Sequence, residues 1–182
     1  DKTDLKQIKG QTINLVELSV SHYLLARGLD SIGLTERDVN VVNTSDADLV
    51  AAYTTEDVTS VVTWNPLLSE IEKQPSTSKV FDSSNIPGEI IDLLVVNTQT
   101  LKENPKLGKA LVGAWYEIME KMSADQNALS HMAEASGTDL AGYQAQLAST
   151  KMFYKAKEAV EFTQSPHLGK TMKYVAEFSF KH

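Results

Sequence analysis

Two short stretches contain the residues whose types could bind a ligand, and each stretch follows an apolar run. The first, Glu-Leu-Ser-Val-Ser-His at 17–22, lies where a predicted strand passes into a predicted helix. The first turn of a helix has backbone N–H groups without intrahelical partners and a partial positive charge. Ser19, Val20 and Ser21 are therefore candidates for a cradle that holds an anion or a carbonyl oxygen. The plainer alternative is that a serine only caps the helix.

The second stretch is Trp64-Asn65-Pro66, which follows the β-branched run 58–63. An aromatic face and an amide at a strand end suit a small polar ligand, because the ring gives shape and the amide gives oriented hydrogen bonds. Alternatively, Trp64 only covers the core and Asn65 caps a helix. His22, at the start of the first helix, is either a donor in a ligand pocket or a packed side chain with one satisfied nitrogen.

An alternation of strands and helices would bring both stretches to one place. The residue pattern predicts strands at 12–17, 39–42 and 58–63, and helices at 19–32 and 47–53. Strands that alternate with helices form βαβ units and hence a largely parallel sheet. Ligands of such sheets gather beyond the carboxyl ends of the strands. We therefore expect both stretches at one edge of the sheet.

The chain changes character near residue 97. Before that point a short helix is predicted from Leu67, and further strands are predicted at 80–81 and 90–96. From Thr98 onward helices dominate, and the longest is predicted to begin with Pro105 at its first helical position. Further helices are predicted at 124–135, 138–148, 155–163 and 167–180. The expected fold class is α/β: a parallel-rich sheet with flanking helices, followed by a mostly helical C-terminal part.

Composition and spacing exclude several classes of function. The net charge of −7 and the scattered basic residues argue against nucleic-acid binding. The chain has no cysteine, and its four histidines are too far apart in sequence for metal-ligand spacing. No phosphate-binding loop, GxGxxG or GxSxG motif occurs. We therefore expect no catalytic residues, no metal and no cofactor, and also no membrane span, since no apolar run approaches about 20 residues.

The order of several motifs resembles the solute-binding proteins of ABC importers for nitrate, alkanesulfonates and taurine, and the related proteins of thiamine-pyrimidine metabolism. The landmarks are the segment from Leu5 to Gly10, the stretch Ser19 to Leu25, Trp64-Asn65-Pro66, and Glu103-Asn104-Pro105. The resemblance is stronger up to about residue 122 than beyond. Within this family, the segments VELSVSHYLLARGL and TWNPLLSEI most resemble the branch associated with urea carboxylase gene clusters.

This resemblance implies a type 2 periplasmic-binding-protein-like fold, in which two lobes close on a solute about a hinge. Residues 1–90 would form the second lobe, and 91–182 a returning strand and C-terminal helices of the first lobe. The hinge would lie at Gly10 and at Pro87-Gly88. The residues expected to contact a small polar solute are Ser19, Val20, Ser21, His22, Trp64 and Asn65.

The same resemblance implies a membrane permease as partner, and a periplasmic or cell-surface lipoprotein location. The first-lobe section that precedes the Leu5 landmark in the family is missing here, so a fragment is expected. Asn65 stands where many relatives carry an acid. An amide suits a neutral, urea-like solute and also tolerates an anion, so nitrate, taurine, other sulfonates and urea all stay open.

Two other classes of function compete with transport. The family's fold also hosts a pyrimidine-forming enzyme of thiamine biosynthesis, which would show a cysteine-rich or histidine-rich motif and a pyridoxal-binding lysine. The absence of cysteine and of a histidine cluster favours transport. An interaction module, whose helical second half binds a partner, is the third class.

Overall fold

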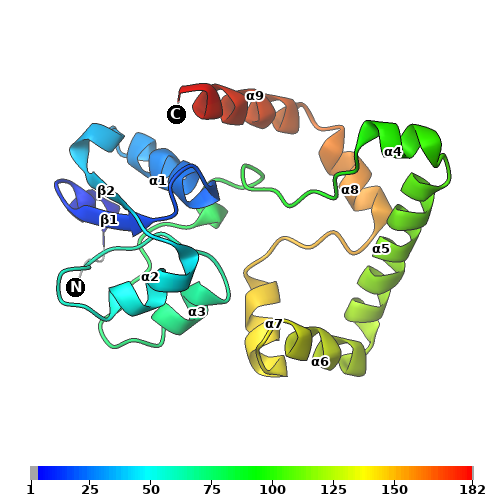
Figure 1. The fold of residues 1–182 in the computed structure, drawn as a ribbon, viewed down its shortest axis with the longest axis horizontal. Helices are drawn as coiled ribbons and strands as arrows, with labels where there is room; N and C mark the ends of the chain where they lie inside the picture. Colours follow the sequence, from blue (N-terminus) through cyan, green and yellow to red (C-terminus); the bar gives the residue numbers. More distant parts are fainter. Residues whose placement is uncertain (1–3, 182) are drawn as a thin grey trace. The chain divides into compact units, whose positions relative to one another are not determined.

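A computed structural model describes residues 4–181 of the chain, which divide into two compact units. The first unit contains the described residues up to Ile90 and those from Gly169 onward, and the second unit is Ile91–Leu168. Figure 1 shows the helices and strands of both units. Both candidate ligand stretches lie in the first unit.

The first unit combines a small sheet with helices and short 3-10 turns. Its elements are η1 (Leu5–Ile8), β1 (Thr12–Leu15), α1 (Val20–Ser31), η2 (Glu36–Asp38), β2 (Asn40–Asn43), α2 (Asp46–Tyr53), α3 (Leu67–Ile71), η3 (Ser83–Asn85) and most of α9 (Pro166–Lys181). The helices predicted at 19–32 and 47–53 are confirmed as α1 and α2.

β1 is the middle one of three parallel segments. It pairs with β2 in parallel register over all four of its residues. On its other side, the Asn14 N–H donates to the Ser60 carbonyl and the Asn14 carbonyl accepts from the Val62 N–H, both at 3.0 Å. The strand predicted at 58–63 is wrong, because this segment makes a single parallel bridge, Asn14 with Val61, in the described part of the chain. The parallel topology is confirmed.

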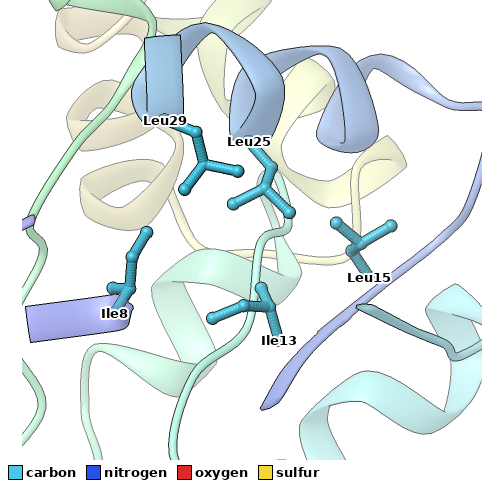
Figure 2. Packing of buried hydrophobic residues seen from close by; sticks show 5 residues of the cluster. All are labelled: Ile8, Ile13, Leu15, Leu25 and Leu29. Carbon is cyan, nitrogen blue, oxygen red and sulfur yellow. The ribbon is translucent and has the colours of Figure 1, made fainter. Parts of the chain in front are cut away.

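A cluster of branched aliphatic side chains joins the sheet to α1. In Figure 2, Leu25 and Leu29 of α1 point toward Ile13 of β1, with Leu15 and Ile8 on either side. Leu25 and Leu29 are four residues apart and so lie on one face of the helix. All five side chains are buried, and Leu15 and Leu29 are 0% exposed. Since burial of one such side chain contributes about 1.5–3 kcal/mol, this cluster holds α1 on the sheet.

Within the first unit, the C-terminal part of α9 covers α1 with aromatic rings. The Phe178 ring centre lies 5.3 Å from that of Tyr23 and 5.8 Å from that of His22, both edge-on. The Arg27 guanidinium lies 4.8 Å from the centre of the Tyr174 ring. These contacts between residues distant in sequence fix α9 against the outer face of α1.

The second unit has helices as its regular structure: α4 (Thr98–Glu103), α5 (Leu107–Ala124), α6 (Gln126–Ala135), α7 (Leu140–Ala148) and α8 (Ala156–Thr163). Its core contains Met119 and Met122 of α5 packed with Leu129 of α6. The predicted helices of the C-terminal part are confirmed, and α4 to α7 are labelled in Figure 1. Among the described residues, no helix is both long and apolar enough to cross a membrane.

Two predicted strands and one helix start are wrong. Residues 80–81 and 90–96 form no strand, because nothing in the described chain pairs with their backbone, and Val95 is 80% exposed. Helix α5 begins at Leu107, whereas Pro105 lies in the preceding turn, which the Leu107 N–H closes onto the Asn104 carbonyl at 2.9 Å. Proline suits either position, since its fixed φ fits both a first helical residue and a turn.

Candidate ligand-binding site

The loop between β1 and α1 places the start of α1 at the carboxyl edge of the sheet. Ser19 is the N-cap residue: its Oγ accepts from the Ser21 N–H at 3.1 Å and donates to the Val16 carbonyl at 2.6 Å. The capping interpretation of Ser19 is therefore confirmed. Val20 is the first helical residue and is 54% exposed. The loop thus places the backbone N–H donors of the first turn of α1 at the positive end of the helix dipole.

Ser21 and His22 lie behind the loop. Their exposed fractions are 3% and 7%. The His22 Nδ1 accepts from the Leu18 N–H at 3.1 Å, and its Nε2 lies 2.8 Å from Oε1 of Glu36. Both ring nitrogens are thus engaged by other residues of the fold, and the contact with Leu18 ties His22 to the loop that contains Ser19.

Trp64 and Asn65 follow the segment that bridges to β1. Trp64 is 38% exposed, and its carbonyl accepts from the Leu68 N–H at 2.9 Å. The Asn65 side-chain oxygen accepts from the Ser69 hydroxyl at 2.7 Å. The N-cap residue of α3 is Pro66 and no side chain caps this helix, so the capping alternative for Asn65 is wrong. The Trp64 indole leaves part of its surface accessible.

The structure brings the two stretches to one edge of the sheet. The segment before Trp64 runs parallel to β1, and Ser19 follows β1 directly. Parallel segments end on the same side, so Ser19 and Trp64 both lie beyond the carboxyl ends. This is the edge at which α/β proteins hold their ligands.

Polar residues of the strands themselves support this edge, although the sequence pattern did not predict this role. The Asn14 side-chain amide donates to the Thr44 hydroxyl at 2.9 Å. The Glu17 N–H donates to the Asn43 side-chain oxygen at 3.0 Å and so ties the loop to the end of β2. Asn14 is 6% exposed, and its Oδ1 has no hydrogen-bond partner in the described structure. An asparagine inside an apolar strand is the sequence feature that could have revealed this support.

A cavity of about 160 Å³ lies elsewhere in the first unit. Its lining is mostly apolar and includes Ile13, Leu25, Val61 and Phe81. In the part of the chain that the structure describes, none of the six predicted ligand residues lines it. The cavity is therefore separate from the six residues predicted to contact a solute. The described part of the chain also contains no group of three or more His, Asp or Glu side chains that could hold a metal ion.

The predicted hinge residues lie in turns of the first unit. Gly10 and Gly88 have φ of 73° and 78°, a range that favours glycine. The Gly10 N–H donates to the Asp38 carbonyl at 2.6 Å. Pro87 and Gly88 lie in the turn just before Glu89.

Glu89 is clamped onto α1. Its carboxylate accepts from Nε and Nη2 of Arg27 at 2.6 and 2.9 Å, and from the Tyr23 hydroxyl at 2.8 Å. The side chains of Arg27 and Glu89 are 20% and 16% exposed. Burial raises the pKa of Tyr23 well above its usual value, and the hydrogen bond to Glu89 adds to this. The hydrogen bond to Glu89 also raises the pKa of Arg27. The residue that follows Pro87-Gly88 is thereby fixed to the helix that begins at the candidate site.

Two solved sulfonate-binding proteins share the fold of this chain. The alkanesulfonate-binding protein SsuA from Xanthomonas axonopodis pv. citri, solved with bound MOPS, superposes with a TM-score of 0.68 at 20% identity, over 82% of this chain. The periplasmic aliphatic sulphonate-binding protein SsuA from Escherichia coli gives a TM-score of 0.67 at 18% identity, over 95% of this chain. At these identities the likeness shows the fold.

The chain belongs to the NMT1/THI5-like family, whose sequence model matches residues 2–129. The taurine-binding periplasmic protein of Escherichia coli (strain K12) is 24% identical to it over an alignment of 139 positions that covers 70% of this chain. The chain spans 42% of the length of that relative, and 52% and 61% of the two solved chains.

Proposed function

We propose that the protein is the solute-binding component of an ABC-type importer and that it captures a small sulfonate, with taurine and short alkanesulfonates as first candidates. The observation that carries this proposal is the start of α1, where Val20 is exposed at the sheet edge that Trp64 also borders. Membership of the family and the named ligands of the similar proteins support it. Nitrate and urea-like solutes are the competing ligands.

The proposed contacts divide between exposed and buried residues. The Val20 N–H would donate to a sulfonate oxygen, and the positive end of the α1 dipole would favour its charge. Residues 16–22 and 63–69 contain no lysine or arginine that could take this role. The Trp64 indole would pack against the apolar part of the solute, and the Asn65 amide would orient it. Ser19 would act through its position as N-cap. Ser21 and His22, which are buried, would act from behind the loop.

The proposal also covers the larger assembly. Residues 1–90 would form the second lobe, and the chain from residue 91 to the point where α9 joins the first unit would belong to the first lobe. The lobes would close about Gly10 and Pro87-Gly88. A membrane permease would recognise the closed form, with the protein in the periplasm or on the cell surface as a lipoprotein. No catalytic step is part of this role.

The variant Val20→Pro tests the donor with little effect on the fold. Proline is tolerated at the first helical position and removes only the N–H there. The preceding Ser19 has φ −97° and ψ −179°, the extended conformation that proline requires of its predecessor. Gln126→Pro makes the same change at the first residue of α6 in the second unit and serves as the matched control.

Calorimetry and thermal shift on the chain would use taurine, methanesulfonate, nitrate, urea and a thiamine-type aminopyrimidine. We expect a sulfonate to raise the melting temperature, since a ligand of the native state stabilises it by mass action. Val20→Pro should weaken sulfonate binding about 10-fold or more, because hydrogen bonds to charged groups contribute about 1.5–3 kcal/mol. Gln126→Pro should leave the affinity unchanged. Unaltered affinity in Val20→Pro contradicts the proposed contact, and binding of only nitrate, urea or the pyrimidine contradicts the solute class.

A further inference from the structure

The loop that leads into α1 contains an unfavourable backbone conformation. Leu18 has φ of 59°, in the left-handed region that non-glycine residues seldom adopt. Its side chain is 70% exposed, so packing of that side chain does not enforce the conformation. Such residues persist only when their surroundings hold them in place. Hydrogen bonds of the loop must therefore supply the restraint.

The imidazole of His22 supplies that restraint at Leu18 itself. The Leu18 N–H donates to the His22 Nδ1 at 3.1 Å. A ring nitrogen that accepts a hydrogen bond carries no proton, so the proton of the neutral ring lies on Nε2. The His22 Nε2 lies 2.8 Å from the Glu36 Oε1. The negative charge of this carboxylate favours a ring proton on the nearer nitrogen, Nε2, and so leaves Nδ1 to accept from the loop.

The ring is also held in place by parts of the chain far from the loop. Glu36 lies in η2, and the Phe178 ring of α9 packs edge-on against the imidazole at 5.8 Å. His22 is 7% exposed. A single buried ring therefore connects η2 and α9 to the peptide two residues before Val20.

We propose that His22 is a positioning residue of the solute site: it holds the Leu18 peptide in the conformation from which the chain enters α1 at the exposed Val20, and Glu36 sets its tautomer. This inference rests on the proposed function, because Val20 is the donor assigned there to the solute. His22 itself makes no contact with the solute in this scheme.

Two substitutions separate the two ring nitrogens. His22→Asn places a side-chain oxygen near the position of Nδ1 and keeps an acceptor for the Leu18 N–H. His22→Gln places its polar atoms near the position of Nε2 and keeps only the contact with Glu36. We expect His22→Asn to retain affinity for taurine or methanesulfonate within about 3-fold, and His22→Gln to lose about 10-fold, the effect of one hydrogen bond. Equal affinities of the two variants would overturn the proposal.

Amide hydrogen exchange at Leu18 reads the same contact without any solute. His22→Asn should keep this amide protected and His22→Gln should expose it. Leu29→Val, which weakens the core away from the loop, is the control: it should lower the melting temperature without changing affinity or Leu18 exchange. If the unmodified protein binds neither sulfonate, the proposed function fails, while the exchange experiment still decides the role of His22.

Nitrogen NMR of the imidazole in the unmodified protein covers the case in which the variants do not fold. We expect the ring proton on Nε2 and an unprotonated Nδ1. A proton on Nδ1 would contradict the proposal, because two donors would then face each other at Leu18.

Discussion

The two units build their cores from different side chains. The first unit buries branched aliphatic residues, and Leu15 and Leu29 are 0% exposed. The second unit relies on Met119 and Met122, which are 5% and 6% exposed, with partly buried tyrosines around them. Branched side chains fill a fixed shape in few rotamers, whereas methionine adapts to irregular space. The unit that carries the candidate site is therefore expected to be the more rigid and the less tolerant of substitution.

The tryptophans allow this comparison to be measured. The chain has two, Trp64 in the first unit and Trp115 in the second. Trp115→Phe leaves a fluorescence reporter for the first unit alone, and Trp64→Phe leaves one for the second. Each prediction below uses the reporter of the unit that is changed.

The largest effect is expected from Leu29→Ala in the core of the first unit. The lost burial and the cavity left behind should lower the free energy of unfolding by about 3 kcal/mol. Urea unfolding followed by Trp64 would measure it. Leu93→Ala, at a side chain that is 59% exposed in the second unit, is the control and should change stability by less than about 0.5 kcal/mol. Similar losses in the two variants would contradict the burial described for Leu29.

The next effect is expected from Glu89→Ala, which leaves Arg27 with its guanidinium largely buried and without this carboxylate. We expect a loss of about 2 kcal/mol, since the largely buried guanidinium then keeps only the carboxylate of Asp30, which is 63% exposed and lies 2.8 Å from Nη1. The matched change in the second unit is Glu117→Ala, whose carboxylate lies 3.2 Å from Lys121 with side chains 69% and 63% exposed. That exposed pair should contribute less than about 0.5 kcal/mol. A larger loss in Glu117→Ala than in Glu89→Ala would reverse the expected order.

A smaller, pH-dependent effect is expected from Tyr23. Its pKa is raised above the ordinary 10.0 in the folded state, first by burial. The folded protein therefore keeps the phenol neutral where the unfolded chain begins to ionise. Its contribution to stability is complete below about pH 10 and is lost as the pH rises further. Between about pH 9 and pH 11, the melting temperature reported by Trp64 should fall more steeply than in Tyr23→Phe. Parallel curves would show that Tyr23 ionises equally well in both states.

The smallest effect is expected from exchanging the core residue types. Met119→Leu should change the stability of the second unit by less than about 1 kcal/mol, because the volumes are similar and the surrounding residues are adaptable. Leu29→Met should cost the first unit more, up to about 1.5 kcal/mol. Urea unfolding with the two reporters would compare them. Equal costs would indicate that the two cores pack with the same rigidity.

Local patterns in the sequence predicted the helices well, and the strands only in part. Helix α1 follows from apolar residues at helical spacing and from the capping side chain of Ser19, and α2 from the polar residues that precede it; these are properties of neighbouring residues. A strand needs a second segment whose backbone it can pair with, and residue type alone does not predict which segment that is. Residues 58–63 are β-branched, yet they make one bridge with β1, and 90–96 are apolar but unpaired in the described chain. Propensity alone therefore overstated the sheet.

For the candidate site, the sequence predicted the edge of the sheet at which it lies, but not which of its residues are exposed and which support the loop from inside the fold. The parallel order of the segments followed from the βαβ pattern, so Ser19 and Trp64 could be assigned to one edge. The partners of His22 could not be predicted, because Glu36 and Phe178 reach it through tertiary packing. The support that Asn14 and Asn43 give to the loop also depends on the register between β1 and β2.

The apolar stretch 91–96, which has no regular secondary structure, has a practical consequence for anyone who purifies this chain. It reads Ile-Asp-Leu-Leu-Val-Val, and its Leu93, Leu94 and Val95 are 59%, 53% and 80% exposed. Six-residue windows with such side chains and little charge readily stack with copies of themselves into cross-β aggregates. Asp92 supplies the only charge that opposes this stacking, so concentrated samples should gel or cloud sooner once that carboxylate is replaced by an amide.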